Sequence, residues 1–304
     1  MTTPYLDTTL HPIADPAYIA ECQSRLDRDG ALVLQGFATV DAINRVVAES
    51  APRAADAYYA NKTHNVYLTP PDPGLAADHP YNRQVASSKG LIADDQIDDH
   101  SPLREIYNDA AFRAFLCGVL GISDIHPYAD KLSSINVHFA AQGMELGWHF
   151  DNSSFAVTML LQAPKAGGHF EHVPAVRDAD AQDMAYERVA RILGGDEAVH
   201  RLRFAPGALV LFRGRNAMHR VTPTEGDTTR LLVVFAYNDR PGVALSPSAL
   251  GTFYGRTARA VAARHRAGSR TTQTTRPAKR RQASGQACAP ISGTKATSHK
   301  DSVR

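Results

Sequence analysis

A histidine and an aspartate two positions apart are the residues in this chain with the clearest potential for chemistry. His149 and Asp151 lie within the stretch from Gly147 to Asn152. Side chains two apart in a β-strand point to the same face, so the imidazole and the carboxylate would share one surface. These groups are two of the three ligands of a 2-His-1-carboxylate iron site. The pair therefore predicts a third ligand, a histidine on a distant strand that returns to the same place.

A second histidine stands where such a ligand is needed. His219 follows a loop after the apolar run Ala208–Phe212, and ten residues separate it from Arg230, which begins another apolar run. Arginine suits a bound carboxylate, because its planar guanidinium makes two parallel charge-assisted hydrogen bonds. With the earlier pair, His219 and Arg230 predict a metal centre beside a site for a carboxylate.

The elements that must position these residues are helices in the first part of the chain and short strands after it. Capping and apolar spacing predict helices from Asp15 to Gly30, from Thr39 to about Ala60 and from Ser101 to Gly121. Gly/Pro turns then separate apolar or alternating runs, which indicates an α+β layout built on a sandwich or barrel. We expect strands at 31–34, 133–139, 155–162, 169–173, 208–212 and 230–237, and an inserted helix at 182–193.

Residues 61–99 break this pattern. The segment is polar and irregular, and it contains the turn cluster from Pro70 to Gly74. A long loop inside a compact domain is often functional, so we predict either a lid over the site or an ordinary surface excursion.

His149-x-Asp151, the distal His219 and Arg230 together resemble the signature of iron(II)/2-oxoglutarate-dependent dioxygenases. The turn Gly167-Gly168 and the strand after Pro206-Gly207 fit the same pattern. Residues 148–242 resemble the branch that includes free-amino-acid hydroxylases and radical halogenases, and the resemblance covers roughly 14–256. A second His-x-carboxylate pair, His169 and Glu171, directly follows the Gly-Gly turn, and we interpret it as structural.

The resemblance implies a double-stranded β-helix, a jelly-roll or cupin-like core, with N-terminal helices packed on it and a disordered C-terminal tail. The implied domains are a flexible N-terminus at 1–13, a dioxygenase domain at 14–256 and a basic tail at 257–304. Within the domain, we expect the helical part at 14–121 and the β-helix core at 126–245.

It also implies the cofactors Fe(II), 2-oxoglutarate as co-substrate, and O2. Their reaction yields succinate and CO2 and hydroxylates an unactivated C–H bond of a small polar metabolite, in this branch a free amino acid or a derivative. Radical halogenases carry a small residue where this chain has Asp151, so its carboxylate favours hydroxylation. Desaturation, halogenation and a non-catalytic β-helix binding protein remain the alternatives.

We assign roles to individual residues on this basis. The metal ligands and catalytic residues are His149, Asp151 and His219, and the 2-oxoglutarate site comprises Arg230, Thr222 and Asn136. We expect substrate contacts from His138, Asn152, Asn238 and Tyr254. Tyr254 belongs to the group Phe253–Arg256, which would either cap the pocket or plug the barrel end.

Composition and charge limit the wider setting. Of the 304 residues, 43% are hydrophobic and 21% charged, as in a soluble globular protein. No long apolar run, no secretory signal and only three scattered cysteines are present, so we expect a cytoplasmic protein without a membrane partner. The sequence does not define an oligomeric state.

The charge is unevenly distributed along the chain. Residues 257–304 hold 11 basic residues and one acid, which leaves 22 basic and 30 acidic residues in 1–256. The tail lacks aromatic residues interleaved with its charges, so we expect a solvated segment rather than a nucleic-acid-binding arm. The expected partner is a small-molecule substrate.

Overall fold

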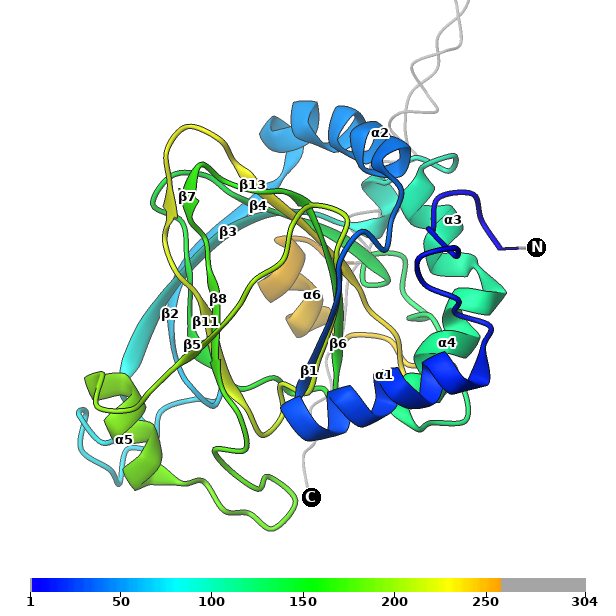
Figure 1. Ribbon diagram of the computed structural model, residues 1–304. Helices are drawn as coiled ribbons and strands as arrows, with labels where there is room; N and C mark the ends of the chain where they lie inside the picture. The colour runs from blue at the N-terminus through cyan, green and yellow to red at the C-terminus, as the bar shows by residue number, and fades with distance from the viewer. Residues whose placement is uncertain (1, 258–304) are drawn as a thin grey trace, which may run out of the picture. The chain divides into compact units, whose positions relative to one another are not determined.

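The computed structural model describes residues 2–257, and the predicted basic, disordered tail lies outside the described residues apart from Thr257. Within this part, eleven strands form one antiparallel sheet that curls into a nearly closed barrel (Figure 1). The strand order is β1-β10-β6-β13-β4-β3-β5-β11-β8-β9, with β2 paired to β3. The predicted α+β class and jelly-roll core are confirmed.

The strands of this barrel are short, and most follow a glycine or proline turn. Their bounds are β1 Ala31–Leu34, β2 Tyr58–Asn65, β3 Gln84–Ile92, β4 Ile135–Ala140, β5 Leu146–His149, β6 Ala156–Gln162, β8 Phe170–Val173, β9 His200–Leu202, β10 Leu209–Phe212, β11 Met218–Val221 and β13 Arg230–Phe235. Two further strands, β7 (Ala166–Gly167) and β12 (Thr224–Glu225), pair separately.

Four helices cover one side of the barrel, and Figure 1 shows α1, α3 and α4 side by side with α2 above them. They are α1 (Pro16–Asp29), α2 (Val40–Ser50), α3 (Pro102–Asn108) and α4 (Ala110–Leu120). Helix α1 begins as its sequence predicts, with the Asp15 carboxylate accepting a hydrogen bond from the Ala17 N–H at 2.8 Å. The largest hydrophobic cluster lies between these helices and the barrel, and it includes Phe37, Phe112 and Phe115.

The alternation of side chains divides the barrel sheet into two faces. Along β4, Ile135, Val137 and Phe139 belong to the cluster beneath the helices. Asn136 and His138 lie between them in sequence and therefore point to the opposite, inner face of the barrel. The polar side chains of β4 thus lie on the inner face of the barrel.

The segment after α2 differs from its prediction. The expected helix to about Ala60 ends at Ser50, because Pro52 cannot continue the helix, and a 3-10 turn (Ala51–Asp56) follows. The expected irregular stretch 61–99 contains most of the hairpin formed by β2 and β3, and the Pro70–Gly74 cluster lies in the connection between them. The predicted helical part 14–121 therefore contributes two strands to the barrel besides β1.

The N-terminal segment also differs from the flexible end that we expected at 1–13. Tyr5 and Leu6 are buried, and Leu6 pairs with Ala38. The Asp7 N–H donates to the Phe37 carbonyl at 3.0 Å. Burial of these two apolar side chains offsets the entropy lost on ordering the segment.

The last described helix lies in the opening of the barrel in Figure 1. This helix is α6 (Pro247–Tyr254), and its Leu250 and Tyr254 share a buried cluster with Leu91 of β3. A further helix, α5 (Tyr186–Gly194), follows β8 and is shorter than the predicted 182–193 helix at its start. None of the described helices is long and apolar enough to span a lipid bilayer.

Candidate metal centre

Two neighbouring strands bring the distant histidines together. His149 is the last residue of β5, and it stands directly opposite His219 of β11 in the antiparallel register. The centroids of their rings are 4.1 Å apart. Asp151 follows immediately after β5, where its N–H donates to the Gly214 carbonyl at 3.0 Å.

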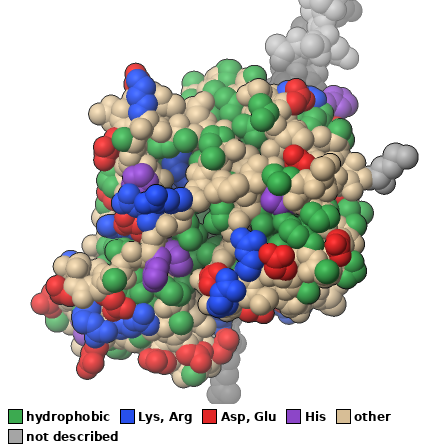
Figure 2. Space-filling view, in the orientation of Figure 1, with side chains coloured by type: hydrophobic (Ala, Val, Ile, Leu, Met, Phe, Trp, Pro, Cys, Tyr) green, Lys and Arg blue, Asp and Glu red, His purple; other side chains and the backbone are tan. Residues whose placement is uncertain are grey.

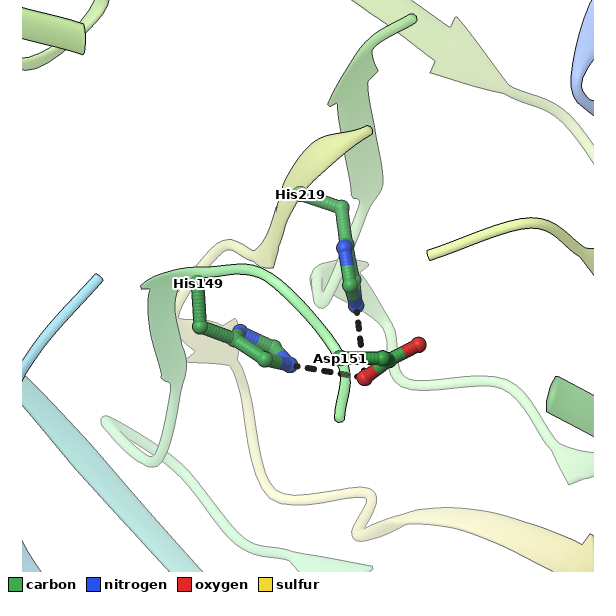
Figure 3. Close-up of side chains that lie close together, drawn as sticks. All are labelled: His149, Asp151 and His219. Atoms are coloured by element: carbon green, nitrogen blue, oxygen red, sulfur yellow. Dashed lines mark ion pairs between the residues drawn. The ribbon is translucent and has the colours of Figure 1, made fainter. Parts of the chain in front are cut away.

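The three side chains converge on one point, as Figure 3 shows. Nε2 of His149 lies 3.6 Å from Oδ1 of Asp151, and Nε2 of His219 lies 3.4 Å from the same oxygen. One ligand atom from each residue falls within 4.8 Å of the others. This is the spacing that three ligands around a common metal ion require.

Backbone carbonyls fix which nitrogen of each histidine faces this point. Nδ1 of His149 lies 2.8 Å from the Gly147 carbonyl, and Nδ1 of His219 lies 3.1 Å from the Ala217 carbonyl. A carbonyl only accepts, so each Nδ1 carries the proton and each Nε2 presents a lone pair. Metal-binding histidines are commonly oriented in this way.

The Asp151 carboxylate occupies space that is open only because residue 214 is glycine. A Cβ added to Gly214 would lie 1.9 Å from Asp151 Oδ2. That oxygen is buried and has no hydrogen-bond partner among the described residues. An unpartnered buried carboxylate oxygen beside two imidazole lone pairs fits a divalent metal ion.

The pKa values within the cluster favour ligand forms of these groups. Burial raises the pKa of Asp151, but the two histidines lower it by more, and the carboxyl stays ionised. Burial and the neighbouring His219 lower the pKa of His149, against the opposing effect of Asp151. A neutral imidazole and an ionised carboxylate are the forms that bind iron.

Arg230 is a buried cation without a counter-ion. It begins β13 opposite Ala140, its residue is 6% exposed, and burial lowers its pKa to about 10. No hydrogen bond or ion pair joins its side chain to any other described residue. A buried unpaired guanidinium is costly, so its position fits an anion that would pair with it.

Thr224, which the sequence did not single out, lies near Arg230 beside Gly168. A Cβ added to Gly168 would lie 2.9 Å from Arg230 Cδ and 3.6 Å from Thr224 Oγ1. The Thr224 hydroxyl is buried and unpartnered. The Thr222 hydroxyl instead accepts from the His169 N–H at 2.9 Å, which leaves it with a structural hydrogen bond.

Three other residues proposed for the 2-oxoglutarate and substrate sites, His138, Asn136 and Tyr254, differ in their surroundings. His138 stands opposite Leu232, on the same face as Arg230, and burial, Lys89 and Arg230 lower its pKa well below the usual range. Asn136 donates to the Ser133 carbonyl at 2.8 Å, and its Oδ1 is buried and unpartnered. Burial raises the pKa of Tyr254 to about 12, and the polar side chains of Ser133 and Asn136 act in the opposite direction.

Two proposed substrate residues do not join this group. Asn152 is exposed in the turn after Asp151. Asn238 lies beyond the far end of β13 from Arg230, where its backbone pairs with His126.

Lys89 is a second inner-face residue that the sequence did not identify. It lies on β3, within the segment that we expected to be irregular. Burial lowers its pKa to about 8, against the opposing effect of the Asp151 charge. Only the alternation of side chains along β3 could have identified Lys89, and that alternation can be assigned to faces only once the β2–β3 hairpin is known.

The second His-x-carboxylate pair does not form a site. Glu171 binds Arg220 at 2.8 Å and Arg201 at 3.1 Å. Arg220 also lies over the Trp148 ring at 4.8 Å. Basic and histidine side chains gather over this part of the barrel, near β5, β8 and β11, on the face seen in Figure 2.

No curated protein matches this chain significantly. Solved structures with the same fold include the alpha-ketoglutarate-dependent epimerase SnoN and carbocyclase SnoK from nogalamycin biosynthesis. SnoN is 16% identical with a TM-score of 0.52, covering 73% of this chain and 84% of its own. SnoK is 11% identical with a TM-score of 0.52, covering 78% and 92%.

A prolyl-4-hydroxylase from Pseudomonas putida is 16% identical with a TM-score of 0.46, covering 71% of this chain and 96% of its own. The chain thus has the fold of SnoN and SnoK, the two solved structures above with a TM-score over 0.5. A family model described as halogenase D, HalD, matches residues 82–246, which is more than half of the chain. The chain belongs to the halogenase D family.

Proposed function

We propose that this protein is an iron(II)- and 2-oxoglutarate-dependent oxygenase that hydroxylates a small polar metabolite. The observation that carries the proposal is the convergence of His149, Asp151 and His219 on one point, on the barrel face that also holds the unpaired Arg230. Imidazole and carboxylate ligands with open positions are characteristic of iron(II) oxygenases.

The cofactor assignment follows from the donor groups. His149, Asp151 and His219 would hold the iron, and Arg230 with Thr224 would bind the distal carboxylate of 2-oxoglutarate. SnoN has been solved with Fe3+ and alpha-ketoglutarate, which supports the same assignment here. When bound, iron and 2-oxoglutarate supply the activation of O2, with release of succinate and CO2.

The protein's own residues contribute orientation and the exclusion of water. Phe212 and Phe170 lie against the His219 ring, with centroids 4.7 Å and 5.5 Å away. These rings limit how the imidazole can turn and keep that side of the site apolar. Holding the reacting groups in a fixed, dry geometry is the main contribution that a protein makes to such a reaction.

The family name raises halogenation as a second candidate, and Asp151 argues against it. A halide needs a free position on the metal, and here Oδ1 of Asp151 lies 3.6 Å from Nε2 of His149 and 3.4 Å from Nε2 of His219. Gly214 leaves room for that carboxylate. We infer hydroxylation, with a free amino acid or a close derivative as the substrate class suggested by the family.

The test is oxidation of 2-oxoglutarate in the presence of candidate substrates. Purified protein with iron(II), O2 and free L-amino acids should form succinate together with a product that has gained one oxygen atom. The same assay with added chloride should give no chlorinated product. Absence of succinate with all candidates, or a chlorinated product, would contradict the proposal.

A further inference from the structure

Three basic side chains lie together on the inner face of the barrel. His138 stands opposite Leu232 of β13 and opposite Leu91 of β3. Arg230 and Lys89 each lie two residues before these partners on the same strand. Side chains two apart share a face, so His138 is flanked by Arg230 on one side and by Lys89 on the other.

None of these three side chains has a hydrogen-bond or ion-pair partner in the described part of the chain. The hydrogen bonds and ion pairs among the described residues include no contact to the side chain of Lys89, His138 or Arg230. Among the described residues, Asp151 is the one acid whose charge acts on Lys89, and it belongs to the candidate metal centre. Arg230 is buried, and Lys89 and His138 are half-buried. A cation largely shielded from solvent without a counter-ion is unfavourable, and a site that tolerates one is suited to an anionic ligand.

The charges of the site support a second anion besides 2-oxoglutarate. Lys89, Arg230 and a divalent iron carry four positive charges, and Asp151 carries one negative charge. Bound 2-oxoglutarate neutralises two of the remaining three. One positive charge is left, and Arg230 is already assigned to 2-oxoglutarate, so the unmatched cation is Lys89.

Lys89 is also placed where a substrate would reach the metal centre. Its strand, β3, pairs with β5, which ends at His149, and Ser87 of β3 accepts a hydrogen bond from the Gly147 N–H at 2.9 Å. On the other side, Leu91 of β3 packs with Tyr254 and Leu250 of α6. Lys89 therefore lies between the metal ligands and the helix in the barrel opening.

We propose that Lys89 binds a carboxylate of the substrate, with His138 beside it as a hydrogen-bonding partner. The substrate is then an organic acid whose carboxylate is held on β3 while another part of the molecule reaches the metal. This inference rests on the proposed function and narrows its substrate class, because neutral metabolites and amino-acid amides would leave Lys89 unpaired.

The test compares Lys89→Met with Lys89→Arg and with Lys165→Met, a control on the surface where the lysine side chain is 63% exposed. Each variant is assayed for succinate formation with free L-amino acids and with the corresponding L-amino-acid amides. Anaerobic binding of iron(II) and 2-oxoglutarate, followed by their visible charge-transfer absorption, is measured in parallel.

The wild type should form succinate with the free L-amino acids and not with the corresponding amides. Lys89→Met should lower kcat/KM for the acid by about 10- to 100-fold, the loss expected for one charge-assisted hydrogen bond. Lys89→Arg should recover part of that loss, and Lys165→Met should match the wild type. The absorption of the iron and 2-oxoglutarate complex should be unchanged in all three variants.

Two kinds of failure are distinguishable. If the wild type forms no complex with iron and 2-oxoglutarate, the proposed function itself is wrong. If the complex forms and amides stimulate succinate formation as well as acids do, the carboxylate proposal is overturned while the proposed function stands. The carboxylate proposal is also overturned if Lys89→Met weakens 2-oxoglutarate binding while leaving the KM for the acid unchanged.

Discussion

At the scale of single residues, the candidate site depends on which side chains are left without partners. Asp151 Oδ2 and the Thr224 hydroxyl are buried and unpartnered, and Arg230 has no counter-ion. Buried polar groups normally find a hydrogen bond, so these three groups without partners among the described residues indicate ligands that complete them. Each can be tested by a substitution that leaves the fold intact.

Gly214→Ala should weaken iron binding without unfolding the protein. The new Cβ would lie 1.9 Å from Asp151 Oδ2, so the carboxylate would have to move. We expect a loss of about 10- to 100-fold in iron affinity, as for other changes that misplace a ligand. Calorimetric titration with iron(II) measures this, and Gly251→Ala is the matched control because its Cβ meets nothing within 4 Å. Equal affinity in the two variants would contradict the role of Gly214.

Thr224→Val should have opposite effects on the free and the loaded protein. Removing a buried, unpartnered hydroxyl should leave the stability of the free protein equal or slightly higher. It should weaken 2-oxoglutarate binding by about 3- to 10-fold if the hydroxyl donates to the co-substrate. Thermal unfolding and a 2-oxoglutarate titration separate the two effects. An unchanged 2-oxoglutarate affinity would remove Thr224 from the site.

Substrate binding should weaken as the pH rises through about 8. Burial lowers the pKa of Lys89 to about 8, and Asp151 acts in the opposite direction. Lys89 is charged below this pH and can attract a carboxylate, and it loses that charge above it. His138 lies beside Lys89 and is already neutral, and Arg230 beyond it stays charged to a pH of about 10. A KM for the acid that stays flat from pH 7 to 9 would contradict this reading.

At the scale of elements, helix α6 is attached to the barrel at its C-terminal end by an ion pair. Both guanidinium nitrogens of Arg256 reach Asp95, one of them at 2.6 Å, and the two side chains are only 18% and 12% exposed. Lys62 of β2 also donates to the Thr252 carbonyl at 3.3 Å. The helix thus bridges the β2–β3 hairpin and the turn after it.

The double variant Asp95→Asn/Arg256→Gln, with its two single variants, should reveal coupling between these residues. A largely buried, two-bond ion pair should give a coupling energy of about 1–3 kcal/mol, above the value for exposed pairs. Urea unfolding measures the four free energies. Limited proteolysis should cut the single variants faster within 243–256. Additive free energies would mean that the ion pair does not hold the helix.

The sequence could predict those elements whose signals are local. Asp15-Pro16 defines the start of α1, and the alternation from Ser133 to Phe139 defines the faces of β4. The cluster of His149, Asp151 and His219 could also be predicted. β-Strand geometry alone relates His149 to Asp151, and the position of His219 before Arg230 suggested the third ligand. What could not be predicted was pairing between distant segments. Lys89 stayed hidden because only its register against β4 and β5 places it on the inner face.

At the scale of the whole chain, the charge of the described domain and the charge of its interior have opposite signs. Residues 1–256 hold eight more acids than basic residues, whereas Lys89 and Arg230 face the barrel interior. Positive side chains inside a domain of net negative charge raise the local potential and attract anions that reach them. This agrees with 2-oxoglutarate and a small organic acid as ligands.

In the proposed site, the cluster of His149, Asp151 and His219 would hold iron, and Arg230 would hold 2-oxoglutarate. Anaerobic titration with iron(II) and 2-oxoglutarate, followed by visible absorption, tests both parts in a single experiment. The wild type should develop the charge-transfer band of a chelated 2-oxo acid. His219→Ala should lose iron and the band together, and Arg230→Leu should keep iron but need much more 2-oxoglutarate. A full-strength band in His219→Ala, or an unchanged 2-oxoglutarate requirement in Arg230→Leu, would contradict the account.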